Sequence, residues 1–222
     1  MLNHYKKHKK TYQAVDCIIF GFDQDDLKIL LIKRDFEPEK GKWSLMGGFL
    51  REEETLDDAA NRVLNKLTGL HDIYMEQLRS FSHPDRDPVD RTVSTAYFAL
   101  INILNHNEAL KEKYSAEWFS INEIPELIFD HKQMVEKAIK RLRYKASVEP
   151  IGFELLPEKF TMRQFQKLYE AIQGQKLDKR NFIKKILNQD VLIKLDEKDK
   201  TSSKKGSFLY KFDTKKYHRF KF

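Results

Sequence analysis

The sequence predicts an α+β protein built of a mixed α/β body followed by a smaller basic module. Apolar β-type runs and a helix with regular apolar spacing predict the body. The charge distribution predicts the second part. Residues 151–222 hold 18 of the 41 Lys and Arg but only 9 of the 34 Asp and Glu, a net charge of +9, which leaves −2 for residues 1–150. A basic module favours a polyanionic partner, with a solubilising surface as the alternative.

Composition limits the class of protein. With 222 residues, 41% of them apolar, the chain is long enough for one large domain or two small ones. It has no run of about 18 apolar residues that could cross a membrane, and its basic N-terminal segment lacks the apolar stretch of a signal peptide. The single Cys17 excludes an internal disulfide and a cysteine-rich metal site. We therefore expect a cytoplasmic protein that makes no membrane contact.

The body begins with a predicted β-hairpin. Residues 14–22 and 27–32 are β-type runs separated by the turn DQDD. Residues 41–50 indicate a strand that enters a tight glycine loop, and the apolar spacing of residues 54–67 predicts a helix that Gly69 ends. The remaining predicted elements are strands at residues 73–82, 92–104 and 116–120 and a basic helix at residues 130–145.

The pattern changes after a connector with proline and glycine at residues 146–157. Thr161 and Gln164 have the spacing of a capping box at the start of a helix. Asp178 is a good N-cap for a second helix at residues 179–188. Two β-type runs around a charged loop then predict a hairpin. Helix, turn, helix and hairpin is the order of a winged helix-turn-helix.

This second module, residues 149–222, is predicted to bind double-stranded DNA, and residues 1–148 form the first domain. An α-helix fits the major groove, where Arg and Asn read base edges and Lys contacts phosphates. The candidate DNA-binding residues of the second helix and the hairpin tip are Lys179, Arg180, Asn181, Lys184, Lys185, Lys198, Lys200, Lys204 and Lys205. An ordinary helical subdomain and an RNA-binding module are the alternatives, although the exposed aromatic pattern of single-strand readers is missing.

Residues 48–70 have the spacing of a phosphate-handling motif, the Nudix box. Its family form is Gly, five residues, Glu, seven residues, Arg-Glu-aliphatic, any residue, Glu-Glu, any residue, Gly-aliphatic. The positions that match are Gly48, Glu54, Arg62, Leu64, Gly69 and Leu70. The three further glutamates of the motif are replaced by Val63, Lys66 and Leu67. The segment resembles the Nudix box in its spacing, and the resemblance implies a Nudix-like α/β/α sandwich with a mixed sheet.

The three replaced glutamates decide the predicted chemistry. Nudix hydrolases use them to hold Mg²⁺ against a diphosphate, and a hard cation needs several oxygen ligands from one cluster. Val63 and Leu67 supply no oxygen, and Lys66 adds a positive charge that repels a cation. Glu54 alone is a poor substitute, and we expect it to form a structural pair with Arg62. The resemblance and these departures together imply no hydrolase activity, no metal site and no cofactor.

Nearly the whole chain resembles one family, the Nudix-related transcriptional regulators of bacteria. The resemblance includes FDHKQMVEKAIKRLR, LLPEKFTMRQFQKLYEAI and LDKRNFIKKIL. One branch of that family senses ADP-ribose and controls NAD metabolism, and another senses pentoses. The chain looks closest to the arabinose-responsive branch, which implies a homodimeric repressor of sugar utilisation that L-arabinose releases from a palindromic operator. An ADP-ribose-responsive regulator and a Nudix ADP-ribose pyrophosphatase are the alternatives.

A neutral pentose requires hydroxyl partners and a flat apolar wall. The candidate effector-binding residues are Asp16, Lys42, Trp43, Gly48, Phe49, His83 and Asp85. Asp16 is a lone carboxylate within an apolar strand, so it needs a partner or a ligand. A lysine partner for Asp16, core packing of Trp43 and Phe49, and a turn position for His83 are the structural alternatives.

Overall fold

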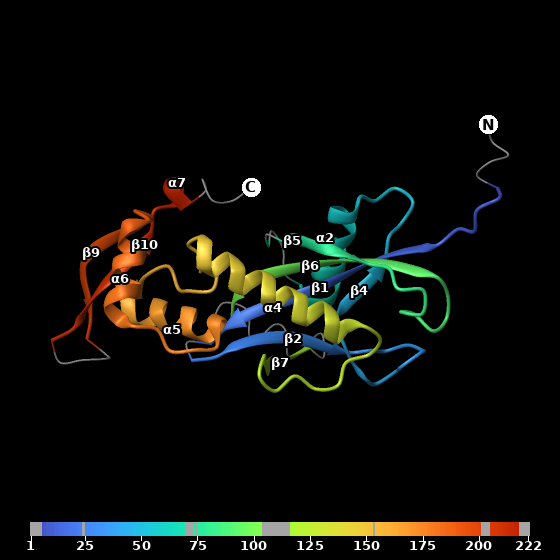
Figure 1. Ribbon diagram of the computed structural model, residues 1–222, viewed down its shortest axis with the longest axis horizontal. Helices are drawn as coiled ribbons and strands as arrows, with labels where there is room; N and C mark the ends of the chain where they lie inside the picture. The colour runs from blue at the N-terminus through green and yellow to red at the C-terminus, as the bar shows by residue number, and fades with distance from the viewer. Residues whose placement is uncertain are drawn as a thin grey trace.

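The computed structural model describes residues 6–23, 25–69, 73, 75–103, 116–152, 154–200 and 205–217. In chain order its elements are β1 (Tyr12–Phe22), β2 (Leu27–Lys33), β3 (Trp43–Ser44), β4 (Met46–Phe49), α2 (Leu56–Thr68), β5 (Met75–Phe81), β6 (Thr92–Asn102), β7 (Ala116–Ser120), α4 (His131–Val148), β8 (Phe160–Thr161), α5 (Met162–Gln173), α6 (Lys179–Asn188), β9 (Leu192–Asp199), β10 (Ser207–Phe212) and α7 (Thr214–Tyr217). Figure 1 shows two parts that meet along α4: a larger part with β1–β7 and α2, and a smaller part with α5, α6 and the β8–β10 sheet. Among the described residues, no helix is long and apolar enough to cross a membrane.

Strand β1 is the centre of the larger sheet. It pairs in parallel with β6 over its whole length, from Tyr12 opposite Thr92 to Phe22 opposite Asn102. Along its other edge β1 pairs antiparallel first with β4 and then with β2. Strand β5 pairs antiparallel with β6, and β3 and β7 pair antiparallel with β2. The sheet is therefore mixed, which confirms the predicted topology class.

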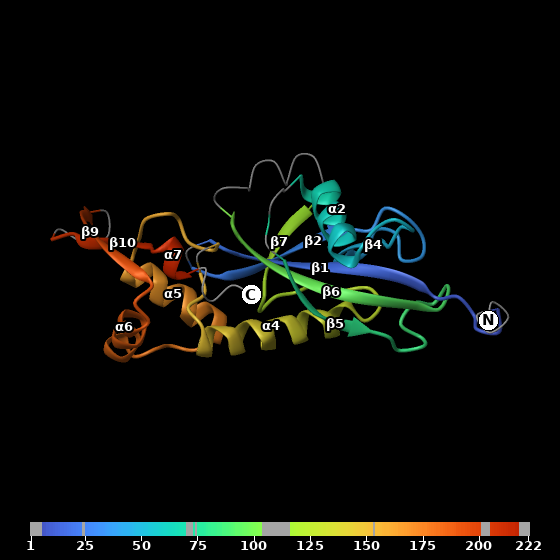
Figure 2. The same cartoon turned by 90° about the horizontal axis from the view of Figure 1, so that it is seen from above.

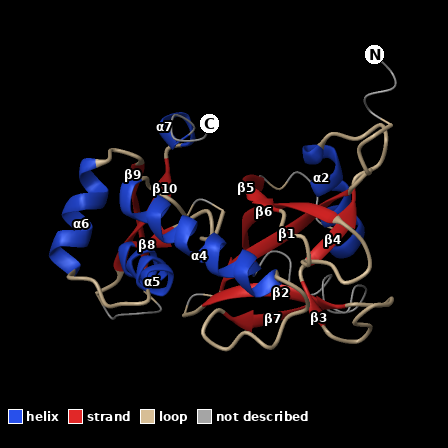
Figure 3. Cartoon of the chain, turned by 45° about the vertical axis from the view of Figure 1, so that its right-hand side comes forward, coloured by secondary structure: helices blue, strands red, loops and turns tan. Residues whose placement is uncertain are grey.

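Two helices cover the two faces of this sheet (Figure 3). Successive side chains of a strand point to opposite faces, and β1 follows this rule. Val15, Cys17 and Ile19 pack in one core cluster with α2, whereas Ile18 and Phe20 pack in another with α4. Because both faces are buried, β1 is an almost continuous apolar run. The arrangement is the α/β/α sandwich that the sequence predicts.

Helix α2 begins at Leu56, two residues later than predicted. The Thr55 hydroxyl accepts a hydrogen bond from the backbone N–H of Asp58 at 3.2 Å, and the Asp58 carboxylate accepts the backbone N–H of Thr55 at 3.0 Å. This reciprocal capping box starts the helix after Thr55, so Glu54 lies in the preceding loop. Gly69 ends the helix in the left-handed conformation, with φ of 70°, as predicted.

Three predicted strands are divided or shortened in the structure, and β1 and β2 are one or two residues longer than predicted. The single strand predicted at residues 41–50 is two short strands, β3 and β4, on either side of Leu45. The backbone N–H of Leu45 donates to Nδ1 of His131 instead of to a neighbouring strand, which interrupts the ladder. The strands predicted at residues 73–82 and 92–104 are β5 and β6, each shorter by a few residues. These differences leave the predicted order of elements unchanged.

The smaller part has the elements that the sequence predicts for a winged helix-turn-helix. Thr161 and Gln164 form the capping box of α5, with 2.7 Å between the Thr161 N–H nitrogen and Oε1 of Gln164. Asp178 caps α6 by accepting the N–H of Asn181 at 2.9 Å. Strands β9 and β10 form the hairpin, and β8 pairs with β10. The aromatic core that joins helices to hairpin consists of Phe160, Phe165, Tyr169, Phe182 and Phe212.

Helix α4 contacts both parts. Its apolar side chains pack on the larger sheet, and the same core cluster continues into α5. Near the end of α4, Arg143 donates to the carbonyl oxygen of Ile172 at 2.9 Å, and the Gln173 amide donates to the carbonyl oxygen of Arg143 at 3.0 Å. Figures 1 and 2 show α4 running from the larger part to α5. The domain boundary expected between residues 148 and 149 falls at the end of this helix.

Candidate functional site

A cleft of about 400 Å³ opens between β1, β4, α2 and the start of α4. This volume lies within the range of small-molecule sites in proteins, roughly 300–1,000 Å³. The glycine pair Gly47-Gly48 and the facing side of α2 form one wall, and the aromatic rings of Phe36 and Phe129 lie on the lining of the cleft. Four cationic side chains also line it: Arg34, Arg62, Lys66 and Arg86. The cleft therefore combines flat apolar surfaces with positive charge.

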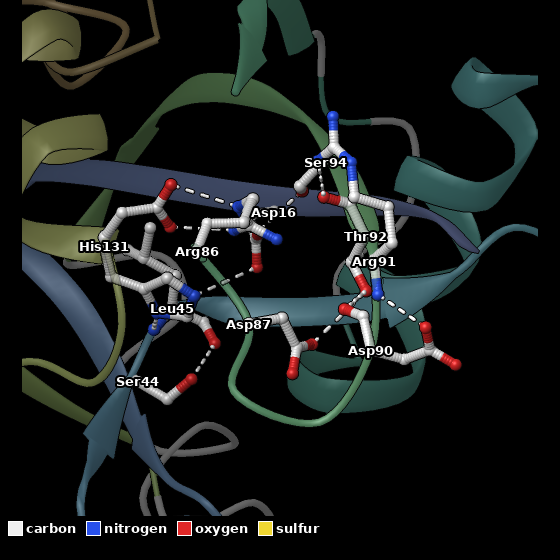
Figure 4. Close-up of polar contacts among 11 residues, drawn as sticks. Asp16, Ser44, Leu45, Arg86, Asp87, Asp90, Arg91, Thr92, Ser94 and His131 are labelled. Atoms are coloured by element: carbon white, nitrogen blue, oxygen red, sulfur yellow. Dashed lines mark hydrogen bonds and ion pairs between the residues drawn. The ribbon is translucent and has the colours of Figure 1, made fainter. Parts of the chain in front are cut away.

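Asp16 lies on the floor of the cleft and is satisfied by three partners (Figure 4). Its Oδ2 accepts the Ser94 hydroxyl at 2.6 Å and faces Nη2 of Arg86 at 3.5 Å. Its Oδ1 faces Nε2 of His131 at 3.5 Å. The Asp16 side chain is only 7% exposed, and a buried carboxylate is costly unless it is hydrogen-bonded and paired. The expected need for a partner is thus met by an arginine, a serine and a histidine.

Arg86 connects this carboxylate to the start of α4. Its Nε and Nη2 donate to the two carboxylate oxygens of Asp130 at 3.0 and 2.8 Å. The Arg86 side chain is 4% exposed, so both ion pairs are shielded from water. A two-point arginine–carboxylate contact fixes orientation as well as charge. The loop that carries Arg86 is therefore tied to the residue that precedes α4.

The first residue of α4, His131, is held as a neutral ring. Its Nδ1 accepts the backbone N–H of Leu45 at 3.1 Å, so the ring proton is on Nε2, which faces Asp16. Burial lowers the pKa of His131 below its ordinary value, although Asp16 and Asp130 act in the opposite direction. Nδ1 can accept a hydrogen bond only in the neutral form of the ring. Protonation of His131 would therefore break its hydrogen bond with the backbone N–H of Leu45, the residue between β3 and β4.

Glu54 and Arg62 form the structural pair that we expected. Arg62 donates through Nε to Oε1 of Glu54 and through Nη2 to Oε2 at 2.7 Å, and Nη2 also donates to the carbonyl oxygen of Phe49 at 2.9 Å. These hydrogen bonds hold the pKa of Glu54 below its usual value and raise the pKa of Arg62. The pair ties the loop before α2 to the helix and to the end of β4.

The three substituted positions of the Nudix box lie on the cleft side of α2. Val63 is 2% exposed and belongs to the core, Leu67 packs against the same core cluster, and Lys66 is exposed. All three line the cleft. Within the described ranges, no group of three or more His, Cys, Asp or Glu side chains could hold a metal ion. The donor set of this cleft therefore does not fit the Mg²⁺ of Nudix hydrolases.

The predicted effector-binding residues divide between the cleft and its surroundings. Asp16, Gly48 and Phe49 line the cleft. Phe49 is 52% exposed, and its ring lies 5.4 Å from the ring of Tyr12. Gly48 allows α2 to approach closely, because a Cβ at this position would lie 2.7 Å from Cγ2 of Val63.

Four other predicted residues lie outside the cleft. Trp43 packs edge-on against Phe119 with ring centroids 4.8 Å apart, and Lys42 is exposed and forms an ion pair with Glu39. His83 and Asp85 line a separate groove that runs past Arg86 and Asp130. The sequence order places these residues near the cleft, but the turn at residues 83–86 directs only Arg86 into it.

Sequence reasoning missed several residues that the cleft contains. They are Arg34, Phe36, Arg86, Phe129 and His131. Arg34 follows β2 directly, and its guanidinium lies 3.8 Å from the ring centroid of Phe36. A charged residue directly after a buried strand is a sequence signal that could have identified Arg34 as a candidate for the cleft. Nothing in the local sequence indicates that Arg86 and His131, which are 45 positions apart, meet Asp16.

The candidate DNA-binding residues of α6 are all exposed. Lys179, Arg180, Asn181, Lys184 and Lys185 lie opposite the buried Phe182 and Ile186. Lys185 differs from the other four because its ammonium group has a partner within the protein. Its Nζ donates to the carbonyl oxygen of Ser147, at the end of α4, at 2.8 Å. The other four remain available to a partner of the smaller part.

The hairpin adds further lysines. Lys198, Lys200 and Lys205 are exposed, and Lys204 lies outside the described residues. The Nζ atoms of Lys194 and Lys198 lie 3.7 and 4.6 Å from the ring centroid of Phe208. Cation–π contacts of this kind orient an ammonium group without neutralising its charge. The α6 face and the hairpin thus form one basic module.

Comparison with known proteins places both parts. The NUDIX domain family matches residues 10–141, and the NrtR DNA-binding winged helix domain matches residues 152–212. The ADPR responsive transcriptional repressor NtrR of Acinetobacter baylyi is 33% identical over 222 residues, which cover 97% of this chain and 88% of that protein. An ADP-ribose pyrophosphatase of Methanocaldococcus jannaschii is 37% identical over 135 residues, covering 61% of this chain and 77% of that protein.

Two solved structures extend the comparison. Shewanella oneidensis NrtR complexed with a 27mer DNA has a TM-score of 0.81 and 29% identity, and the match covers 92% of this chain and 95% of that chain. The NUDIX domain of Shewanella oneidensis NrtR complexed with ADP ribose has a TM-score of 0.52 and 29% identity, and the match covers 62% of this chain and 92% of that chain.

The Nudix sandwich with its cleft and the appended winged helix define a two-part regulator. The chain belongs to the Nudix-related transcriptional regulators that join a NUDIX domain to an NrtR DNA-binding winged helix domain. The expected arabinose-responsive regulator of sugar utilisation is wrong, because the relative that matches across both parts is ADPR-responsive and the similar NUDIX domain was solved with ADP ribose.

Proposed function

We propose that the protein is a DNA-binding transcriptional repressor that leaves its operator when ADP-ribose binds in the Nudix cleft. The observation that carries this proposal is the match across both parts to an NrtR solved with DNA, together with a cleft that four cationic side chains line beside three aspartates. ADP-ribose combines a diphosphate with a flat base and two sugars. The cleft offers cationic side chains for the diphosphate and aromatic rings for the flat base.

DNA binding falls to α6 and the hairpin. Lys179, Arg180, Asn181 and Lys184 project from the exposed face of α6, a helix of ten residues whose other face is anchored by Phe182 and Ile186. A helix presented in this way fits the major groove, with Arg and Asn suited to base edges and Lys to phosphates. We propose that two copies bind a palindromic operator as a homodimer, one winged helix in each half-site.

Helix α4 couples the two sites in this proposal. Its first residue, His131, contacts the cleft floor through Asp16, and its last turns contact α5 and α6 through Arg143 and Ser147. A ligand that changes the partners of Asp16 or Arg86 therefore acts on one end of a helix whose other end holds the winged helix. An effector shifts such an equilibrium only by the difference between its affinities for the two arrangements.

A second candidate function is hydrolysis of ADP-ribose, and the Methanocaldococcus pyrophosphatase relative favours it. The cleft supports binding without hydrolysis, because Val63, Lys66 and Leu67 replace the glutamates that the Nudix box uses for Mg²⁺. Mg²⁺-dependent formation of AMP from ADP-ribose by the full chain would favour the enzyme, and its absence in an assay that detects a Nudix hydrolase would favour the regulator.

A mobility-shift assay tests the proposed function. The DNA is a duplex selected from a random library by its binding to the full chain, and ADP-ribose, AMP and L-arabinose are titrated separately into the complex. We expect ADP-ribose to release the duplex and L-arabinose to leave it bound. Release by L-arabinose alone, or no selection of duplex DNA, would contradict the proposal.

A further inference from the structure

We propose that Lys66 takes the place of the divalent cation in this cleft, so that the diphosphate of the effector is held by the lysine ammonium group and binding requires no Mg²⁺. This inference rests on the proposed function, because it names the chemistry by which the same cleft recognises ADP-ribose. Lys66 occupies a position of the Nudix box at which the motif has glutamate.

The position of Lys66 follows from a helix whose start, end and close approach to the glycine loop match the motif. The capping box of Thr55 and Asp58 starts α2, and Gly69 ends it. Gly48 lets the helix lie against β4, because any Cβ there would meet Cγ2 of Val63 at 2.7 Å. The side chain at position 66 therefore borders the same cleft as the glycine loop, and only its charge is reversed relative to the motif.

The other cations of the cleft are largely committed to protein partners. Arg62 is paired with Glu54, and Arg86 is paired with Asp130 and Asp16. Arg34 donates to carbonyl oxygens of its own loop, those of Phe36 at 3.1 Å and Pro38 at 2.6 Å. Lys66 forms no ion pair or hydrogen bond with any residue in the described ranges, so all three of its ammonium donors are available to an anion.

The carboxylates of the cleft do not compensate for the lost glutamates. Asp16 is buried and bound to Ser94 and Arg86. Asp35 and Asp87 also line the cleft, but no three candidate metal ligands come together in the described part of the chain. A cation would meet Lys66 at a place where the motif supplies oxygen. Mg²⁺ demands several oxygen ligands in near-ideal geometry, whereas a lysine ammonium binds phosphate as a point charge with three donors.

This substitution separates binding from hydrolysis. A divalent cation in a Nudix site both offsets phosphate charge and helps to make a nucleophile from water. The ammonium of Lys66 can perform the first role and not the second, because it has no open coordination position for water. A cleft of this kind retains an intact diphosphate, which is the property that a sensor needs.

Calorimetric titration of ADP-ribose into the full chain tests the inference. Kd is measured in excess EDTA and in excess Mg²⁺ for the wild type, for Lys66→Glu and for Lys140→Glu. Lys140 is an exposed lysine of α4 outside the cleft, so its variant carries the same change of net charge. We expect equal affinity in both buffers for the wild type and for Lys140→Glu. For Lys66→Glu we expect binding in EDTA to be weaker by roughly tenfold or more, the usual loss for a hydrogen bond to a charged group.

The outcomes separate the inference from the proposed function. Binding that appears only with Mg²⁺, or a Lys66→Glu variant with wild-type affinity in EDTA, overturns the role of Lys66 and leaves ADP-ribose as the effector. No binding of ADP-ribose in either buffer overturns the proposed function itself. A second probe, inorganic pyrophosphate in EDTA, is expected to compete with ADP-ribose in the wild type and to lose this competition in Lys66→Glu. Circular dichroism of each variant verifies that the exposed substitution leaves the fold intact.

Discussion

Arg86 and Asp130 form a two-point ion pair that joins the loop beside the cleft to the start of α4, with nitrogen–oxygen distances of 3.0 and 2.8 Å. Both side chains are largely buried, and Nη2 of Arg86 also faces Asp16. The cleft floor and the helix that reaches the winged helix are therefore parts of one charge network. Any ligand that engages this network acts on both.

Replacement of Arg86 by Ala is expected to destabilise the protein strongly, because it leaves Asp16 and Asp130 without their shared cation. Breaking a buried pair in this way typically costs about 3–5 kcal/mol, which urea denaturation of the variant measures as a drop in the free energy of unfolding. Arg91→Ala in the same loop is the control, since the Arg91 guanidinium makes, among the described residues, only 3.4 Å contacts to the carbonyl oxygens of His83 and Thr92. Equal stability of the two variants would contradict the network.

The stability of the protein is expected to fall as the solution is acidified through the pKa of His131. Burial lowers the folded-state pKa of this ring below the ordinary 6.5, so the unfolded chain binds more protons than the folded one. Its contribution is present in full above about 6.5 and is lost as the pH falls from there through the folded-state pKa. His131→Asn, which keeps an acceptor for the N–H of Leu45 and cannot be protonated, should show a flatter profile. Free energies of unfolding measured between about pH 7.5 and about pH 5, on either side of the ordinary histidine pKa, give the difference.

Gly48 and Val63 are expected to behave as a coupled pair. Gly48→Ala places a Cβ 2.7 Å from Cγ2 of Val63, and overpacking of this kind costs roughly 1–3 kcal/mol. Val63→Ala removes the obstructing methyl groups, so the double variant should be less destabilised than the sum of the single variants. A double-mutant cycle with a coupling energy below about 0.5 kcal/mol, the scatter for independent sites, would show that the helix does not press on the glycine loop.

The DNA face is tested by single charge removals. Lys184→Ala is expected to weaken duplex binding and to lower the slope of log Kobs against log salt by about one, as for one phosphate contact. Arg180→Ala should weaken binding and also change the preferred sequence if it contacts a base edge. Lys140→Ala on α4 is the matched control and should leave both affinity and slope unchanged. Fluorescence anisotropy of a labelled duplex at several salt concentrations measures all three.

Local signals in the sequence predicted most of the fold. The helix caps at Thr161, Asp178 and Gly69 depend on residues within one helical turn, so the sequence spacing predicts them. The contacts within the cleft were harder to predict from the sequence, because the pairing of distant strands determines them. Asp16 meets Ser94 across 78 positions, since β1 lies parallel to β6. It meets Arg86 across 70 positions, because the loop before β6 brings Arg86 to the cleft.

The same limit applies to a lysine that was assigned from its place on the polar face of a predicted helix. Lys185 has the sequence context of a DNA contact, yet packing of α6 against the end of α4 directs its Nζ to Ser147. The replaced glutamates indicated a cleft without its metal. Their loss was also interpreted as evidence against a diphosphate effector, and this interpretation, together with family likeness, led to the arabinose expectation that the ADPR-responsive relative contradicts.

Energetic coupling between the Nudix cleft and the winged helix is measured most directly by the affinity of the protein for its duplex with and without saturating ADP-ribose. The two Kd values define a coupling factor, which by linkage must equal the factor by which the duplex weakens ADP-ribose binding. We expect a coupling of at least roughly fivefold, within the usual range of allosteric proteins, and the same factor from both directions. A duplex affinity that saturating ADP-ribose leaves unchanged, while calorimetry shows the effector bound, would contradict the account.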